Sequence, residues 1–180
     1  MMKKILTVFL AALMILSFAA CGTTPADDQQ EGSSNPNYED TLAALVAAIY
    51  EKKPLEMMVS QAIEIDIADA DALRYYLGLE SADGITEAVF SEAMTGSQAY
   101  SLCLARLGEG ADVDAIKNGI LNGVDTQKWI CVGADQLIVG NCGDVVIMVM
   151  ADSQLSPTLA EEIYGAFVEI TGATGDKLTK

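Results

Sequence analysis

Apolar residues recur along the chain at two different spacings, which predicts both helices and strands. The first helical spacing is that of Leu42, Leu45, Val46 and Ile49. Asp40 or Thr41 can cap this helix, and Pro54 ends it. A second, short helix is predicted over residues 69–77. It ends at Gly78, because glycine readily adopts the left-handed backbone that closes a helix.

Two strand pairs are predicted further along. Residues 85–94 and 98–107 read as strands around the turn Thr95-Gly96-Ser97. Residues 136–140 and 145–151 read as a hairpin that turns through Asn141-Cys142-Gly143-Asp144. The run from Val145 to Met150 is apolar on both faces, which is typical of a central strand.

A helix follows each strand pair. The first is predicted from Asp112 to about Cys131, where Gly119 and Gly123 weaken the helix and indicate close packing. The second is predicted to begin with Ser156 as its N-cap and to end at Gly172. Its buried stripe consists of Leu159, Ile163, Phe167 and Ile170.

These elements predict an α+β fold in the order α-α-β-β-α-β-β-α. The simplest assembly is an antiparallel sheet of about four strands with helices packed on it. The other face of that sheet is then either covered by the N-terminal helices or open as an interaction surface. The residues expected on it are Tyr100, Leu102, Leu104, Met148 and Met150.

The first 20 residues have the pattern of an export signal. Lys3 and Lys4 precede an apolar run and the small residues Ala19 and Ala20, and Cys21 follows. We expect cleavage before Cys21 and attachment of diacylglycerol to its sulfur, with the protein held on the outer face of the bacterial cytoplasmic membrane. Residues 21–37 are polar and predict a flexible tether, and residues 38–180 predict one globular domain.

Charge narrows the possible partners. The 180-residue chain has a net charge of −16. Removal of residues 1–20 leaves 8 basic and 26 acidic side chains, a net charge of −18. Such a surface repels nucleic acid. The chain has no histidine, which excludes Ser-His-Asp and Cys-His catalysis and every histidine metal site.

Several short sequence motifs resemble those of a known family. They are Tyr75-Tyr76-Leu77-Gly78-Leu79, the strand that contains Ala99, Gln127-Lys128, and Gly140-Asn141 before an apolar strand and helix. With the lipidation motif at Cys21, the chain resembles small bacterial lipoproteins of the family called domain of unknown function 4358. The resemblance spans about residues 38–171. It implies an extracytoplasmic lipoprotein domain, with no established activity and no catalytic residues to carry over.

The remaining three cysteines raise the possibility of redox chemistry. Exported proteins tolerate disulfides, so a bond between Cys131 and Cys142 is one possibility, and two separate small apolar side chains are the other. Cys103 lies on a predicted strand among small residues and is expected to be buried and inert. A catalytic thiol would lack a histidine to activate it.

The acidic group Glu64, Asp66, Asp69 and Asp71 resembles a calcium-binding run. It fails as an EF-hand, because Arg74 stands where that loop needs glycine. We therefore expect no metal, and interpret the acidic residues as the start of a helix. Trp129 could stack on a ligand if it is exposed, although core packing is the alternative. Met57, Met58, Met148 and Met150 could form an adaptable surface or belong to the core.

Together these features predict a lipid-anchored binding module that meets an envelope protein, a peptide or a small ligand, with no cofactor besides the lipid on Cys21. One alternative is a small cell-envelope enzyme that uses carboxylates or a Cys131/Cys142 redox pair. The other is a structural spacer.

Overall fold

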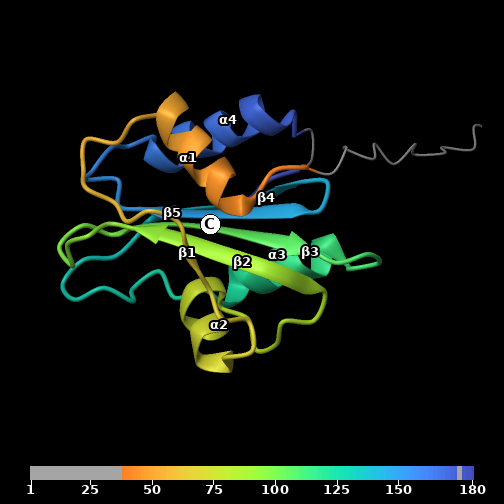
Figure 1. The fold of residues 1–180 in the computed structure, drawn as a ribbon. Helices are drawn as coiled ribbons and strands as arrows, with labels where there is room; N and C mark the ends of the chain where they lie inside the picture. The colour runs from red at the N-terminus through yellow and green to blue at the C-terminus, as the bar shows by residue number, and fades with distance from the viewer. Residues whose placement is uncertain (1–37, 174–175) are drawn as a thin grey trace, which may run out of the picture. The chain divides into compact units, whose positions relative to one another are not determined.

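An antiparallel six-stranded sheet forms the centre of the domain (Figure 1). The structure is a computed structural model that describes residues 38–173 and 176–180. The described residues belong to one compact unit. The expected signal peptide, Cys21 and tether lie outside the described residues. The strands are β1 (Ile63–Glu64), β2 (Ile85–Glu92), β3 (Tyr100–Leu107), β4 (Gln136–Cys142), β5 (Val145–Ala151) and β6 (Leu178–Thr179).

The strand order is β1-β2-β3-β5-β4-β6. The predicted α+β class and the antiparallel sheet are confirmed, whereas the predicted strand number of about four was too low. The additional strands β1 and β6 are two residues long and lie at the two edges. β3 and β5 form the central pair, in the register Cys103↔Met148. As predicted, β5 is central and buried along its whole length.

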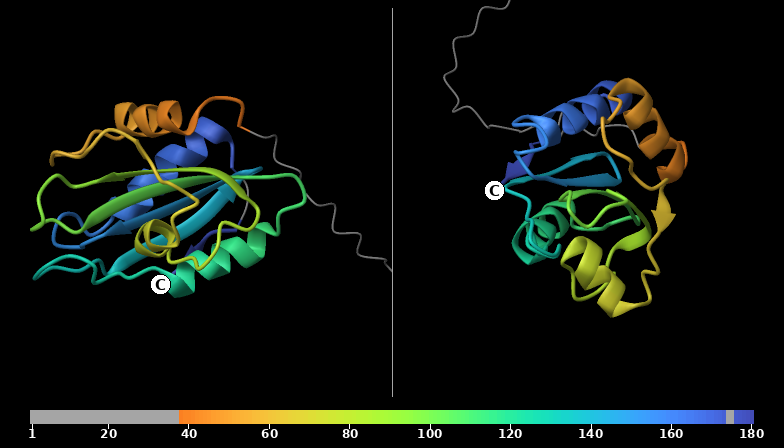
Figure 2. Two further views of the ribbon diagram at one scale, coloured as in Figure 1. Left: turned by 60° about the horizontal axis from the view of Figure 1, so that its bottom comes forward. Right: turned by 90° about the vertical axis from the view of Figure 1, so that its left-hand side faces the viewer.

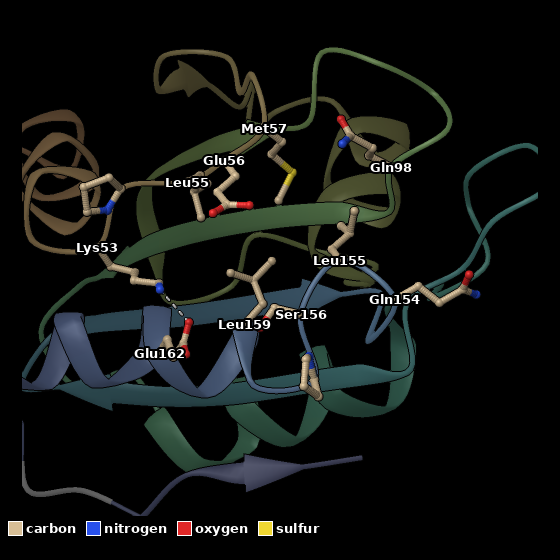
Figure 3. A pocket seen from close by; sticks show the side chains of 12 residues that line it. Lys53, Leu55, Glu56, Met57, Gln98, Gln154, Leu155, Ser156, Leu159 and Glu162 are labelled. Atoms are coloured by element: carbon tan, nitrogen blue, oxygen red, sulfur yellow. Dashed lines mark ion pairs between the residues drawn. The ribbon is translucent and has the colours of Figure 1, made fainter.

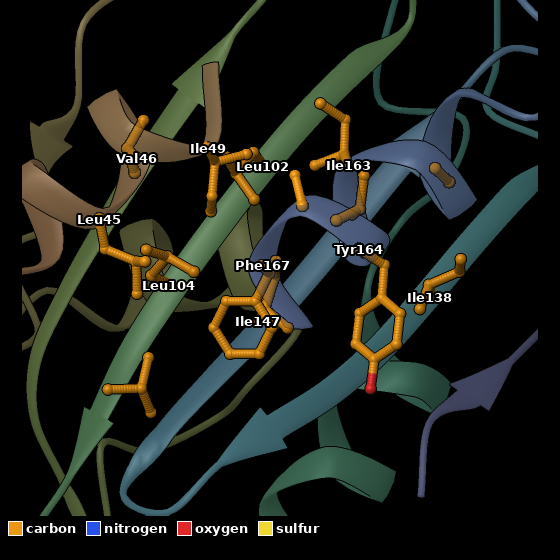
Figure 4. Packing of buried hydrophobic residues seen from close by; sticks show 14 of the residues in the cluster. Leu45, Val46, Ile49, Leu102, Leu104, Ile138, Ile147, Ile163, Tyr164 and Phe167 are labelled. Carbon is orange, nitrogen blue, oxygen red and sulfur yellow. The ribbon is translucent and has the colours of Figure 1, made fainter. Parts of the chain in front are cut away.

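Helices cover both faces of the sheet, as the end-on view in Figure 2 shows. α1 (Leu42–Lys52) and α4 (Leu159–Thr171) lie on one face, and α2 (Ala70–Leu77) and α3 (Val113–Gly123) lie on the other. Each face has its own hydrophobic core because the side chains of a strand alternate between faces. Figure 4 shows the core beneath α1 and α4, where Phe167 packs close to Ile147 and Leu104.

The predicted interaction surface was wrong in two respects. All five of its residues, Tyr100, Leu102, Leu104, Met148 and Met150, are fully buried. They also lie on different faces: the first three pack under α1 and α4, and the two methionines pack against the core of α2 and α3. The register explains this division, because Cys103, not Leu102 or Leu104, is the residue opposite Met148.

Local capping sets most helix ends. The Thr41 hydroxyl accepts from the Ala44 N–H, so Thr41 is the N-cap of α1. Gly78 and Gly172 end α2 and α4 in the left-handed conformation, as the sequence predicts. α4 differs at its start, because its N-cap is Thr158 and not Ser156.

α3 is shorter than predicted. It ends at Gly123 rather than near Cys131, and Val124 is already extended. The close packing predicted at the two glycines is confirmed. A Cβ on Gly123 would lie 2.0 Å from the Gly78 carbonyl oxygen, and one on Gly119 would lie 2.9 Å from the Leu79 side chain. Residues 124–135 form a loop, which contains Trp129.

The second hairpin is also tighter than predicted. β4 continues through Cys142, so only Gly143 and Asp144 form the turn, with Gly143 at a φ of 50°. Arg106, at the same end of the sheet, donates to the carbonyl oxygens of Tyr38 and Asp40 and pairs with Asp144. Arg106 thus fixes the point where the described chain enters the domain.

Candidate functional site

A pocket lies at the opposite end of the sheet from Arg106. It has a volume of about 610 Å³, and we call it the end pocket (Figure 3). Three regions distant in sequence form it: the chain after α1, the β2–β3 turn, and the β5–α4 loop with the first turn of α4. Its lining residues are Lys53, Pro54, Leu55, Glu56, Met57, Gln98, Gln154, Leu155, Ser156, Pro157, Leu159 and Glu162. The stretch of β3 from Tyr100 to Arg106 spans about 20 Å, which separates the pocket from the point of chain entry.

One side of the end pocket carries an ion pair. The Lys53 ammonium lies 2.7 Å from the Glu162 carboxylate, and both side chains are more than one-third exposed. Hydrogen bonds from Lys53 and then from the Thr158 hydroxyl lower the pKa of Glu162 below its ordinary value. Glu162 therefore remains a carboxylate at neutral pH and is poorly suited to act as a general acid.

The rest of the lining combines apolar and amide groups. Leu55, Met57 and Leu155 are half-buried. Gln98 and Gln154 lie on the side away from the ion pair, as Figure 3 shows. Six of the twelve lining residues are polar or charged, so a ligand held here would meet amide, hydroxyl and charged groups as well as apolar ones. The end pocket can hold an amphipathic ligand.

Trp129 belongs to a second arrangement, which we call the lysine clamp: Lys128, Glu92, Tyr75, Tyr76 and Trp129. The Lys128 ammonium lies 2.5 Å from Glu92 and is 4.5–5.2 Å from the centroids of the three aromatic rings. The Lys128 side chain is 3% exposed. The ammonium and the carboxylate oxygen make no hydrogen bond of good geometry, so the attraction between them is mainly electrostatic.

The lysine clamp shows whether Trp129 is a ligand-stacking residue or a packing residue, the two interpretations that the sequence allowed. Trp129 is half-buried and packs against the core of α2 and α3. A lysine of the same chain already lies over its ring, as it does over those of Tyr75 and Tyr76. Trp129 is therefore part of the packing that holds the α3–β4 loop on the domain, and it is not an open stacking surface.

The disulfide considered between Cys131 and Cys142 does not form. Cys131 is an exposed, free thiol in the loop before β4, with a φ of 70°. Cys142 is buried at the far end of β4, where its thiol donates to the Thr171 carbonyl oxygen. From Gln136 to Cys142 the strand extends about 20 Å, well beyond the reach of a disulfide of about 7 Å.

Cys103 is buried, as expected. Its thiol lies 3.5 Å from the Tyr76 carbonyl oxygen. Burial raises the pKa of the Cys103 thiol from 9.0 to about 12, so the reactive thiolate is not available at neutral pH.

Two members of the acidic group, Asp69 and Asp71, act at the start of α2, as interpreted from the sequence, whereas Glu64 lies in β1. Asp69 is the N-cap and accepts from the N–H groups of Asp71 and Ala72. Asp71 pairs with Arg74 at 3.0 Å. Within residues 38–173 and 176–180, no three cysteine or acidic side chains converge in a way that could hold a metal ion.

Sequence reasoning missed the end pocket as a site. Of its lining residues, only Met57 was a candidate binding residue from the sequence. The four methionines considered together, Met57, Met58, Met148 and Met150, do not share one surface. Met57 lines the pocket, Met58 is exposed, and Met148 and Met150 are core. The one sequence signal for this pocket is proline: Pro54 and Pro157 mark two of the loops that form it.

None of the described helices is long and apolar enough to cross a membrane. Comparisons of the chain with protein-family models, with curated proteins and with solved structures found no match.

Proposed function

We propose that the protein is a lipid-anchored binding module on the outer face of the bacterial cytoplasmic membrane, and that its ligand binds in the end pocket. The observation that carries the proposal is the position of the pocket. It lies at the end of the sheet opposite Tyr38, the first described residue, so the attachment and the ligand site that we propose are at different ends of the domain.

Binding accounts for the pocket better than the enzyme alternative does. Glu56 and Glu162 both line it, but Glu162 is engaged by Lys53 and Thr158 and is held ionised. The two members of the alternative redox pair are apart: Cys131 is exposed in the loop before β4, and Cys142 is buried at the far end of that strand. These arrangements favour a ligand that is held over a substrate that is converted.

The anchor is tested by Cys21→Ser in the full-length protein. We expect the variant to leave the membrane fraction while its domain keeps the thermal unfolding midpoint of the unaltered protein. A variant that stays in the membrane fraction would refute the lipoprotein proposal, whatever the pocket binds.

The pocket is tested with two neighbouring methionines. Met57 lines the end pocket, whereas Met58 is 71% exposed outside it. We would record the methyl NMR signals of both residues while adding a panel of uncharged amphipathic fragments. Shifts of Met57 alone, lost in a Gln154→Trp variant that fills the pocket, would support the proposal. No shift of Met57 with any fragment would favour the structural spacer.

A further inference from the structure

The two edges of the sheet differ in how they are protected. At one edge, Lys177 and Lys180 flank the short strand β6. Lysines at an edge strand discourage another chain from pairing with it. At the other edge, residues 58–65, which we call the open edge, have the sequence Met-Val-Ser-Gln-Ala-Ile-Glu-Ile. This run contains no lysine, arginine or proline.

The open edge follows β2 along most of its length. The Met94 N–H donates to the Met58 carbonyl oxygen, and the Ile65 N–H donates to the Ala88 carbonyl oxygen. Between them, Ile63 lies opposite Phe90. Backbone groups alternate in direction along a strand, so the N–H and C=O of Glu64 point away from β2, where a further strand would pair.

Apolar side chains are exposed along the same edge. Five large hydrophobic residues stand exposed in the described part of the chain, and three of them are here: Met58 at 71%, Ile63 at 47% and Met94 at 63%. An exposed edge with apolar side chains and unpaired backbone groups is the surface that extended peptides use when they add a strand to a sheet.

The charged side chains around the open edge indicate what kind of peptide would bind there. Beside the apolar residues, a shallow pocket of about 290 Å³ is lined by Glu64, Asp66 and Glu87 together with Ile65, Ile67 and Thr86. Neighbouring residues of an extended peptide point to opposite faces, so an apolar residue could lie on the side of Ile63 while the basic residue next to it lies on the side of Glu64 and Glu87. A second copy of this chain fits poorly, because it would bring the same carboxylates and a strongly negative net charge to the contact.

We propose that the open edge binds an extended segment of a partner protein in which basic and apolar residues alternate, by adding it to the sheet beside β1. This site is separate from the end pocket and does not depend on it. Met58 reports on the open edge and Met57 on the end pocket, so the two proposals can fail independently.

The test uses three seven-residue peptides capped at both ends. The first alternates lysine and valine, the second alternates glutamate and valine, and the third is the lysine peptide with N-methylated backbone amides. We expect the first peptide to shift the Met58 methyl signal and to slow hydrogen exchange of the Glu64 amide at least tenfold. The other two should bind at least tenfold more weakly, because one reverses the charge and the other cannot pair with the edge.

Variants locate the site. Ile63→Lys and Met58→Lys place a lysine on the open edge and should each weaken binding of the lysine peptide at least tenfold. Ile130→Lys alters a residue that is 83% exposed but lies off the edge strand, and it should leave binding unchanged. The proposal is overturned by no binding, by equal binding of the three peptides, or by full binding to both edge variants. Sedimentation showing that the protein pairs with itself through this edge would also overturn it.

Discussion

The Lys128 ammonium lies 2.5 Å from the Glu92 carboxylate, with the two side chains only 3% and 17% exposed. Glu92 ends β2 and Lys128 lies in the loop after α3, so the pair connects segments that are distant in sequence. The rings of Tyr75, Tyr76 and Trp129 surround the ammonium and supply cation–π attraction. The pair therefore fastens the α3–β4 loop to both α2 and the sheet.

Replacing Lys128 with methionine leaves the Glu92 carboxylate buried without its partner. We expect the free energy of unfolding, measured in urea, to fall by about 3 kcal/mol. The double variant Lys128→Met/Glu92→Leu should recover part of this loss, because no charge then remains buried. Lys52→Met breaks an exposed pair with Glu169 and should change stability little. Equal losses for Lys52→Met and Lys128→Met would contradict a special role for the lysine clamp.

Cys103 should make the protein less stable in alkali. Its thiol has a pKa of about 12 when folded, against an ordinary value of 9.0, because burial disfavours the thiolate. Between pH 9 and pH 12 the unfolded chain therefore binds fewer protons than the folded one. Stability is unaffected by this group below pH 9 and falls above it, by up to about 1.4 kcal/mol per pH unit.

Urea unfolding at several pH values checks this dependence. Cys103→Ala should flatten the decline between pH 9 and pH 12, whereas Cys131→Ala, which alters an exposed thiol, should not. Some decline remains above pH 10, because burial raises the pKa values of Tyr50 and Tyr100 as well. An identical slope in Cys103→Ala and the unaltered protein would show that Cys103 does not contribute.

The elements that the sequence predicts correctly are those whose signal is local. The spacing of Leu42, Leu45, Val46 and Ile49 identifies α1, and all four are buried as expected. The apolar run of β5 identifies the sheet centre in the same way. β1 and β6 have only two residues each and form because β2 and β4 offer unpaired edges. No pattern within two residues can indicate such a strand.

The candidate sites depend on contacts that a local pattern does not contain. α3 ends at Gly123, which packs against Gly78, a residue distant in sequence, and Trp129 therefore lies in a loop and not in the predicted helix. The end pocket is assembled from three loops and the first turn of α4, which only the tertiary fold brings together. The open edge likewise becomes visible only when the strand order is known.

Tyr50 is expected to matter more for stability than the more deeply buried Tyr100. The Tyr100 hydroxyl donates to Tyr50, whose hydroxyl donates to Ser91, which in turn donates to the Ser60 carbonyl oxygen. Tyr50→Phe leaves the buried Tyr100 hydroxyl without an acceptor, at a cost of about 2 kcal/mol. Tyr100→Phe leaves the bond from Tyr50 to Ser91 intact and should cost less than half as much. Chemical denaturation of both variants decides the order, and a larger loss for Tyr100→Phe would contradict this network.

Alanine substitutions at Gly78 and Gly172 distinguish the cost of backbone strain from the cost of disrupting close packing. Both end a helix with nearly the same left-handed φ, 68° and 69°. A Cβ on Gly172 would meet nothing within 4 Å, whereas a Cβ on Gly78 would lie 2.0 Å from the Val124 backbone nitrogen. Gly172→Ala should therefore cost only the strain of the left-handed conformation, about 1 kcal/mol.

Gly78→Ala has to push α2 away from the end of α3 in addition, so it should cost about 3 kcal/mol or more. Urea unfolding of the two variants measures the difference. Because α2 carries Tyr75 and Tyr76, Gly78→Ala should also disturb the lysine clamp and raise the fluorescence response of Trp129 to an added quencher. Gly172→Ala should leave that quenching unchanged. Equal losses of unfolding free energy in the two variants would mean that α2 and α3 can move apart at Gly78 with no loss of stability beyond the backbone strain.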